Sequence, residues 1–468
     1  MTDTIWLPDL SDSVRSKYIV LIQSIRDAVR SGKLSAGSKL PPVRELAWDL
    51  GITPGTVARA YKMAAEEGLV ETTVGRGTFV SGTFAPPQQD AEIAAAPLIP
   101  HEPDGTIDFR GVHVPDVGQD EAIRAIMGDL SRGGGHDYLD YPTDSTDYAA
   151  RVAVAHWIGN ERAGRIRAED VVLGLGAQKS CISALQAVLH GATPIILTES
   201  LCYPGVRHAA RLLRARLIGV EMDDQGLRPD RLEEVLRQHG GQVLLTSAET
   251  HSPTTTCTSP ERRQQIALLA RKYQLQIIED DCHTITRPEF PAYRALCPER
   301  AWFISSLSKT VSASLRFGYS IAPEGQGLHA RQVAQSTYYG LPQITVDIGA
   351  ALLRSGGAEQ FRRAVQERVA KRVQLAVNRL GQWEINWRVD APFLWLKLPQ
   401  GWRGSTFARA CETKGIRVKP ADEFALADGQ APNAVRLSLD SNLGVGDFEL
   451  ALQTMSGLLS APPLNVDI

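Results

Sequence analysis

The sequence lacks several features that point to particular classes of protein. Its formal net charge is only −3, so no overall basic field is available to attract nucleic acid, and any DNA contact must come from a local patch. Its six cysteines form no C-x-x-C pair, which argues against a zinc site or a disulfide framework and fits a reducing cytoplasm. These cysteines are Cys181, Cys202, Cys257, Cys282, Cys297 and Cys411.

Long hydrophobic runs and an export signal are also missing. The longest apolar runs, such as residues 194–197, have the length of a strand and not of a membrane span. Residues 1–13 show no basic region followed by an apolar one, so we expect no signal peptide and no membrane association. The composition, 43% hydrophobic and 22% charged, is that of a globular protein. A length of 468 residues suffices for two or three domains. We therefore expect a cytoplasmic protein.

The chain divides into three zones. Residues 11–81 hold helical patterns and a Gly-rich hairpin, whereas residues 82–106 are rich in Pro and Ala and are typical of a linker. In residues 107–468, apolar strand-like runs alternate with amphipathic helices, which predicts a mostly parallel sheet with helices on both faces. A long helix is expected at 346–380, followed by a smaller α+β subdomain at about 381–460.

Six buried strands are predicted in the C-terminal zone. They are expected at residues 171–173, 195–198, 243–246, 277–279, 302–305 and 317–321. No internal repeat is evident in the sequence.

The zone 11–81 carries signals for three helices followed by a hairpin. Apolar residues at helical spacing mark the first helix, and Pro42 is suited to open the second. Thr53 followed by Pro54 marks the start of the third, because a hydroxyl cap precedes a proline at the first helical position. A tight hairpin with Arg76 at its tip comes last. This order is that of a winged helix-turn-helix, whose third helix can lie in the major groove while the arginine reaches the minor groove of double-stranded DNA.

Rigid motifs in this zone occur in a fixed order: S-G-x-L-x-x-G-x-x-L-P, R-E-L-A, T-V-x-x-A-Y and G-x-G-T-F-V. On these motifs the segment resembles the GntR family of bacterial regulators. The resemblance, together with the helix and hairpin positions, gives a set of candidate DNA-binding residues. They are Arg44, Thr53, Thr56, Arg59, Arg76 and Gly77.

Two positions depart from the GntR pattern. Pro54 and Ala58 stand where the family often has arginine. Losing two cations lowers the phosphate-driven part of DNA affinity, so binding is expected to depend on a dimer that contacts two half-sites. The alternative is a winged helix that binds another protein.

A second constellation lies in the C-terminal zone. The predicted strand 302–305 leads to Lys309, and a lysine at the end of a buried strand can lose its proton and form an imine. Arg316 can hold a phosphate in a bidentate fork. Another predicted strand ends at Asp280, whose carboxylate could pair with a pyridinium nitrogen. Residues 173–178 join a strand to a helix, and backbone N–H groups at such a helix start bind phosphate.

In this order, the segment from about 107 to 460 resembles the class I, fold-type I aminotransferases, and with a GntR-type head the chain resembles the MocR subfamily of regulators. The resemblance implies pyridoxal 5′-phosphate as cofactor, with Lys309 forming the imine and Asp280 bonding the pyridine nitrogen. Tyr203 would lie beside the ring. The residues implied to hold the phosphate are Ala177, Gln178, Ser306 and Arg316.

The resemblance also implies a partner subunit and a ligand. Tyr141 matches the family tyrosine that reaches the phosphate bound to the partner in a head-to-tail homodimer. Arg436 matches the arginine that grips a substrate carboxylate, and an arginine on a buried strand requires an anionic partner. No metal ligand set is expected.

Two departures concern the cofactor ring. Ser252 replaces an asparagine of the family, and Cys282 replaces a tyrosine two residues after the ring aspartate. Both lost groups normally bond the 3′-oxygen of the ring. Ser252 and Cys282 keep weaker donors, so we expect the cofactor to bind, with unusual imine protonation and poor transamination.

Two modules joined by a linker predict a DNA-binding transcription regulator. Its cofactor domain would sense an amine, an amino acid or pyridoxal phosphate itself and would alter DNA binding through coupled free energies. The alternative is an active aminotransferase with an accessory DNA-binding arm, which Lys309, Asp280 and Arg436 favour and which Ser252 and Cys282 oppose. A regulator that has lost the cofactor is the third option.

Overall fold

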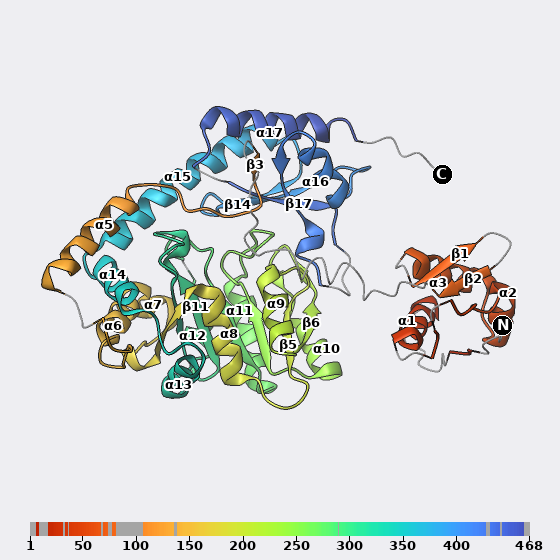
Figure 1. The fold of residues 1–468 in the computed structure, drawn as a ribbon, viewed down its shortest axis with the longest axis horizontal. Helices are drawn as coiled ribbons and strands as arrows, with labels where there is room; N and C mark the ends of the chain where they lie inside the picture. The colour runs from red at the N-terminus through yellow and green to blue at the C-terminus, as the bar shows by residue number, and fades with distance from the viewer. Residues whose placement is uncertain are drawn as a thin grey trace. The chain divides into compact units, whose positions relative to one another are not determined.

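The computed structural model describes most of the chain. The described residues are 6–8, 17–30, 33–35, 37–66, 69–73, 77–80, 106–134, 138–288, 290–426, 431–439 and 442–462. The chain splits into two compact units, Met1–Glu102 and Pro103–Ile468 (Figure 1). The expected linker, residues 82–106, lies outside the described residues except for Thr106.

The N-terminal unit contains three helices and a hairpin, as the sequence predicted. They are α1 (Lys17–Arg30), α2 (Val43–Asp49), α3 (Pro54–Glu66), β1 (Val70–Thr73) and β2 (Gly77–Val80). Leu21, Leu46 and Val57, one from each helix, are buried in a common core. The hydroxyl of Tyr61 on α3 donates to the carbonyl of Pro41 at 2.9 Å, which ties α3 to the start of α2.

A seven-stranded sheet forms the centre of the C-terminal unit, in the order β4-β12-β11-β10-β9-β5-β6. The strands are β4 (Val171–Leu175), β5 (Ile195–Glu199), β6 (Arg216–Val220), β9 (Val243–Thr246), β10 (Gln276–Asp280), β11 (Ala301–Ser306) and β12 (Phe317–Ile321). β12 runs in the direction opposite to the other six strands of this sheet. The six strands expected from the sequence are confirmed, and β6 is an addition.

Both faces of this sheet are buried. In β4, the neighbouring residues Leu173 and Val172 point to opposite faces and belong to different hydrophobic clusters. The elements that connect the strands and cover the sheet are α6 (Tyr148–Ile158), α7 (Asn160–Ala163), α8 (Gly176–Val188), α9 (Pro204–Leu212), α10 (Pro229–His239), α11 (Pro260–Lys272), α12 (Tyr293–Leu296) and α13 (Gly327–Tyr338). Short elements complete it: η2 (Ala168–Asp170), β7 (Met222–Asp223), β8 (Gly226–Leu227) and η3 (Leu307–Lys309).

The prediction of one long helix at 346–380 is wrong in one respect, because this segment belongs to two helices. These are α14 (Gln343–Arg354) and α15 (Gly357–Leu380), and the chain between them turns at Gly356, which has φ 78°. A residue without a Cβ accepts this left-handed conformation at low cost, so the helix ends there. Figure 1 shows α15 running from α14 toward a smaller sheet, where α17 (Val445–Leu459) packs beside it.

The smaller sheet has the order β13-β14-β17-β16, with antiparallel pairs throughout. Its strands are β13 (Ile385–Asn386), β14 (Phe393–Lys397), β16 (Lys419–Pro420) and β17 (Ala434–Ser438), and α16 (Gly404–Glu412) and η4 (Ala421–Glu423) lie between them in sequence. The start of the unit, β3 (Ile107–Asp108), pairs in parallel with β15 (Ile416–Arg417) and is followed by α5 (Gln119–Asp129) and η1 (Leu130–Gly134). This pairing holds residues 109–112 near the small sheet.

Candidate functional site

Lys309 lies where the sequence placed it, just beyond the end of β11. Its side chain is largely buried, and Nζ donates to the carbonyl of Val112 at 2.7 Å. Burial lowers the pKa of Lys309, and the charges of Arg436 and Arg316 lower it further while Cys282 opposes them. A lysine with a depressed pKa is more often neutral, and the neutral amine is the nucleophilic form.

Asp280 ends the neighbouring strand β10, where it pairs with Ile304 of β11. Burial raises the pKa of this carboxyl, and hydrogen bonds from Cys282 partly offset the rise. One of them is donated by the backbone N–H of Cys282 to Oδ1 at 3.1 Å. The charges of Asp280 and Lys309 both affect the pKa of the Cys282 thiol, so the three residues lie in one site.

The turn from β4 into α8 is a candidate anion cradle, in which backbone N–H groups lie near a guanidinium. The first N–H groups of α8 have no side-chain cap, and Gly176 at its start has φ 78°. A Cβ at Gly176 would collide with the guanidinium of Arg316, whose Nη2 donates to the carbonyl of Leu175 at 3.0 Å. Ala177 and Gln178 belong to the first turn of α8. A helix start and a guanidinium that converge on one point favour a phosphate there.

Hydroxyls lie beside Lys309 as well. Ser306 accepts from the N–H of Ser308 at 3.3 Å. The hydroxyl oxygen of Ser308 is buried and has no hydrogen-bond partner within the described part of the chain. Because a buried hydroxyl without a partner costs free energy, this atom fits a site that an additional group completes.

Arg436, on β17, is only 4% exposed and has no carboxylate within ion-pair distance among the described residues. Its guanidinium donates to the hydroxyl of Ser252 at 3.0 Å, the carbonyl of Arg110 at 2.5 Å and the hydroxyl of Ser438 at 3.3 Å. Burial lowers the pKa of Arg436 to about 10. A buried cation bound only by neutral acceptors is well placed to receive an anion.

Aromatic rings complete the wall around Arg436. The guanidinium carbon lies 5.2 Å from the ring centre of Phe393 and 5.0 Å from that of Phe424. Tyr203 directly precedes α9, and burial raises its pKa to about 12. Gln178 donates to the carbonyl of Gly205 at 2.9 Å, which joins the anion cradle to the Tyr203 turn.

Sequence reasoning missed several residues of this site. His283 packs edge-on against Tyr203 and Phe393, and its Nδ1 lies 3.6 Å from Sγ of Cys282. The position of His283, three residues after Asp280 at the end of a buried strand, was a usable signal. Phe393 and Phe424 and the carbonyls of residues 110 and 112 come from distant segments, and no local pattern points to them.

Tyr141 does not join these residues. It is 74% exposed and stacks on Tyr339 with ring centres 5.3 Å apart. No contact within the described part of the chain connects it to Lys309, Asp280 or Arg316.

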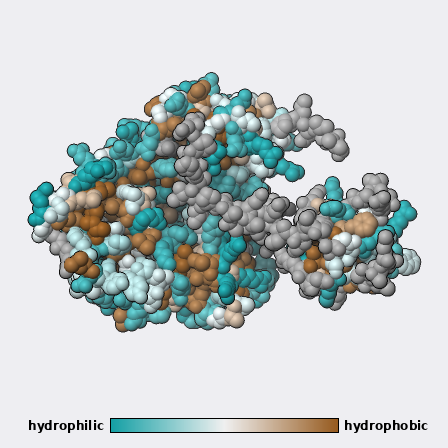
Figure 2. All heavy atoms as spheres, viewed as in Figure 1, coloured by the Kyte–Doolittle hydropathy of each residue, from teal (hydrophilic) through white to brown (hydrophobic). Residues whose placement is uncertain are grey.

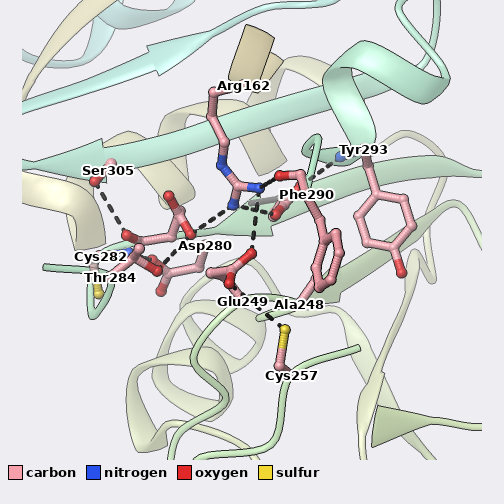
Figure 3. Close-up of polar contacts among 12 residues, drawn as sticks. Arg162, Ala248, Glu249, Cys257, Asp280, Cys282, Thr284, Phe290, Tyr293 and Ser305 are labelled. Atoms are coloured by element: carbon pink, nitrogen blue, oxygen red, sulfur yellow. Dashed lines mark hydrogen bonds and ion pairs between the residues drawn. The ribbon is translucent and has the colours of Figure 1, made fainter. Parts of the chain in front are cut away.

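A buried ion network lies directly behind Asp280. Arg162 bonds Asp281 at 3.0 Å, Glu279 at 3.2 Å and Glu249 at 3.5 Å. Figure 3 shows its guanidinium pointing toward Glu249 and the strand end that carries Asp280. Glu279 and Asp281, the residues directly before and after Asp280, both belong to this network, which therefore holds Asp280 in place.

The candidate DNA-binding residues lie on the N-terminal unit. Arg44 is exposed on α2. At the start of α3 the hydroxyls of Thr53 and Thr56 are 2.9 Å apart, and the N–H of Thr56 donates to Thr53 at 3.3 Å. Arg59 is exposed, but its guanidinium carbon lies 4.2 Å from the ring centre of Tyr18, so its side chain contacts α1.

The hairpin is described only in part. Arg76 lies outside the described residues. Gly77 has φ 116°, and a Cβ there would meet the aliphatic part of Lys39. Lys39 is thus a cation beside the hairpin that the sequence reasoning did not single out.

Comparisons with known proteins match both units. Residues 112–453 match the model of aminotransferase class I and II, and residues 17–80 match that of bacterial regulatory proteins of the gntR family. The chain is 25% identical over 456 residues to the uncharacterized HTH-type transcriptional regulator YdeF of Bacillus subtilis, covering 97% of this chain and 96% of that protein. It is 29% identical over 304 residues to the vitamin B6 salvage pathway transcriptional repressor PtsJ of Salmonella typhimurium, covering 63% and 65%.

Among solved structures, an archaeal alanine:glyoxylate aminotransferase superposes with a TM-score of 0.68 at 22% identity, covering 80% of this chain and 94% of that one. This likeness establishes the fold of the C-terminal unit. Within the described residues, no helix has both the length and the apolar character needed to cross a membrane.

Proposed function

This chain belongs to the aminotransferase class I and II family and carries a gntR-family domain before it, the arrangement of the MocR regulators; on that premise we propose a cytoplasmic, DNA-binding transcription regulator that senses an amino compound or pyridoxal phosphate. The observation that carries the proposal is the convergence of Lys309, Asp280 and Arg316 on one site of an aminotransferase fold. The winged helix supplies the DNA-binding half.

The residues of the site fit pyridoxal phosphate. Ala177 and Gln178 at the start of α8, Ser306 and Arg316 would hold its phosphate, together with the hydroxyl of Ser308, which has no hydrogen-bond partner within the described residues. Asp280 would accept from the pyridine N–H, and Lys309 would hold the aldehyde carbon. When bound, the cofactor supplies an aldehyde that captures amines and a ring that withdraws electrons.

The chain's own residues would select the effector. Arg436 would bind a carboxylate in a pocket from which Phe393 and Phe424 exclude water, so a carboxylate-bearing amine fits best. Ser252 turns its hydroxyl to Arg436, which orients the guanidinium. The name of the relative PtsJ, a vitamin B6 salvage repressor, supports a sensor of the cofactor itself as the second possible effector class.

DNA binding would require a dimer. Figure 2 shows apolar side chains gathered on the surface where α5 and α14 lie in Figure 1. Met127 on α5 and Ile344 on α14 are exposed apolar residues, and so are Leu139, Tyr141 and Tyr339 in the segments that follow α5 and precede α14. A second copy in head-to-tail orientation would cover them and bring Tyr141 to the partner's phosphate, and two winged helices would then contact repeated half-sites.

The second candidate function is an active aminotransferase with a DNA-binding arm. The joint presence of Lys309, Asp280 and Arg436 in one site favours it. Steady turnover of an amino acid with 2-oxoglutarate at ordinary enzyme rates, above about 1 s⁻¹, would establish this alternative.

The test of the proposal measures the absorbance of the bound cofactor and DNA binding under the same conditions. Purified full-length protein is mixed with pyridoxal phosphate, its absorbance is recorded with and without candidate amines, and the promoter beside its own gene is footprinted under the same conditions. We expect a yellow band that one amine shifts and a footprint that changes with it. A protein that takes up no cofactor, or a footprint indifferent to cofactor and amine, would contradict the proposal.

A further inference from the structure

The small sheet presents two cations on one face. Lys419 on β16 lies directly opposite Arg436 on β17 in the antiparallel register. Residues opposite each other in such a pair project to the same face, with Cβ atoms about 5 Å apart. Their neighbours Val418 and Val435 belong to the hydrophobic core that the sheet shares with α15 and α17, on its other face. Lys419 therefore lies on the face that carries the proposed carboxylate site.

One aromatic ring contacts both cations. Nζ of Lys419 lies 5.6 Å from the ring centre of Phe424, and the guanidinium carbon of Arg436 lies 5.0 Å from it. Because a cation is attracted to the face of such a ring, Phe424 holds both side chains near one place. The backbone N–H of Cys202 donates to the carbonyl of Phe424 at 2.9 Å. This bond joins the pair of cations to the turn that carries Tyr203.

The two cations differ in their partners. Arg436 is bound by neutral acceptors, whereas Nζ of Lys419 lies 3.2 Å from Oε2 of Glu423. Burial lowers the pKa of Lys419, Glu423 raises it and Arg436 lowers it, as expected for like charges that face each other across two strands. Glu423 balances one of the two positive charges. The other has no carboxylate within ion-pair distance among the residues that the structure describes.

The Glu423 side chain can leave Lys419 while its backbone stays in place. Arg207 of α9 donates to the backbone carbonyl of Glu423, and also to that of Ala425 at 2.6 Å. The side chain of Glu423 is 43% exposed and that of Lys419 is 21% exposed. An ion pair with water at its side contributes little to stability, because water competes for both charges. Replacing Glu423 on Lys419 by another carboxylate therefore costs little.

We propose that Lys419 is a subsite for a second anionic group of the effector, so that the ligand class of this protein is an amino dicarboxylate. The α-carboxylate binds Arg436, the side-chain carboxylate binds Lys419, and Glu423 turns into the solvent. In the ligand-free protein Glu423 occupies the subsite and balances its charge. A monocarboxylate leaves Lys419 paired with Glu423 and gains nothing from it. The subsite rests on the proposed function, because Arg436 is taken there as the binding site of an effector carboxylate.

Amino acids and their side-chain amides separate charge from shape. Aspartate and glutamate are titrated into full-length protein loaded with pyridoxal phosphate, with asparagine and glutamine as neutral isosteres, and the absorbance change is followed. We expect at least one of the two acids to bind about tenfold more tightly than its amide. Lys419→Met should abolish this preference and leave the amide unchanged. Arg436→Met should weaken acid and amide alike.

Glu423→Gln distinguishes a competitor from a support. Removing a carboxylate that competes for Lys419 should strengthen binding of the preferred acid by about threefold and leave its amide unchanged. The control is Glu412→Gln, whose carboxylate lies 3.5 Å from Arg417 in the same subdomain and is 61% exposed, and which should bind both ligands as the wild type does. Equal affinities of acids and amides in the wild type, an equal loss of both in Lys419→Met, or weaker binding by Glu423→Gln would each overturn the subsite.

A second measurement does not need the cofactor. Succinate and glutarate, which have two carboxylates and no amino group, are titrated calorimetrically into cofactor-free full-length protein beside their monoamides. The dicarboxylate that matches the preferred acid in length should bind more tightly than its monoamide to the wild type and equally to Lys419→Met. No preference in the wild type would overturn the subsite and leave cofactor binding untouched. Wild-type protein that stays colourless with pyridoxal phosphate would contradict the proposed function, and the calorimetric preference would still decide the subsite.

Discussion

Two buried arginines of the C-terminal unit show opposite solutions to the same problem. Arg162 is 7% exposed and Arg436 is 4% exposed, so both guanidiniums have lost most of their water. Arg162 bonds three carboxylates, whereas Arg436 bonds two hydroxyls and a carbonyl. Burial lowers the pKa of both, but Asp281, Glu279 and Glu249 reverse the shift for Arg162.

The difference distinguishes a structural charge from a binding charge. A buried cation whose partners are already present stabilises the fold around it, and removing it leaves several buried anions. A buried cation without a carboxylate is costly in the empty site and is stabilised when an anionic ligand arrives. Substitutions at the two arginines should therefore have opposite effects on the stability of the ligand-free protein.

The largest effect is expected for Arg162→Met. Asp281 and Glu279 would remain buried without this cation, while Glu249 keeps Arg263 at 2.9 Å. Leaving buried carboxylates without their cation costs about 3–5 kcal/mol of the free energy of unfolding. Urea denaturation measures the loss. The control is Arg124→Met, because Arg124 bonds Asp120 at 2.7 Å with both side chains about three-quarters exposed (75% and 76%), and no measurable change is expected. Similar stability of the two variants would contradict a structural role for Arg162.

Arg436→Met should have the opposite signature. The ligand-free protein should be as stable as the wild type or more stable, because a buried cation without an anionic partner is removed. Binding of glycine to cofactor-loaded protein should weaken by about 2 kcal/mol or more, which is roughly 30-fold, while binding of ethylamine should hardly change. An equal loss for both amines would place the carboxylate elsewhere.

Stability should fall in acid through His251 and His283. Burial holds the pKa of His283 and of His251 below that of the unfolded chain, so both are neutral when folded while the unfolded chain takes up protons below about pH 6.5. The stability they contribute is present above that pH and is lost as the pH falls. Each histidine gives a slope of about 1.4 kcal/mol per pH unit, so His283→Gln should flatten the acid side of the stability curve by one such step. An unchanged slope in denaturation between pH 6.5 and 5 would show that His283 is accessible to protons in the folded state.

The smallest effect concerns the anion cradle. Gly176 and Gly191 have nearly equal φ, 78° and 80°, but a Cβ at Gly176 would meet Arg316, whereas one at Gly191 would have nothing within 4 Å. Alanine at either position should cost about 1–2 kcal/mol of backbone strain. Only Gly176→Ala should also weaken pyridoxal phosphate binding, by about tenfold, in a fluorescence titration. Equal affinities of the two variants would contradict a cradle at the start of α8.

The sequence reveals those parts of the fold that local patterns determine. Apolar runs marked β9 and β12 to the residue, because strands buried on both faces are apolar along their length. Lys309 and Asp280 were found because both follow such runs and parallel strands end at a common edge. The break at Gly356 was overlooked, although Ser-Gly-Gly interrupts the helical pattern there.

Non-local contacts explain what could not be foreseen. Phe393 reaches His283 from 110 positions further along the chain, and residues 110 and 112 reach Arg436 and Lys309 because β3 pairs with β15. The three carboxylates around Arg162 come from two strand ends that are distant in sequence. No window of sequence contains these pairs, so composition and periodicity cannot indicate which charges meet.

The attachment point of the cofactor tests the central claim most directly. Full-length protein is loaded with pyridoxal phosphate, reduced with borohydride and digested, and the labelled peptide is identified by mass spectrometry, with Lys309→Ala treated in parallel. We expect one phosphopyridoxyl group, on Lys309, and none in the variant. A label on another lysine, or equal labelling of the variant, would show that residue 309 is not where the aldehyde binds.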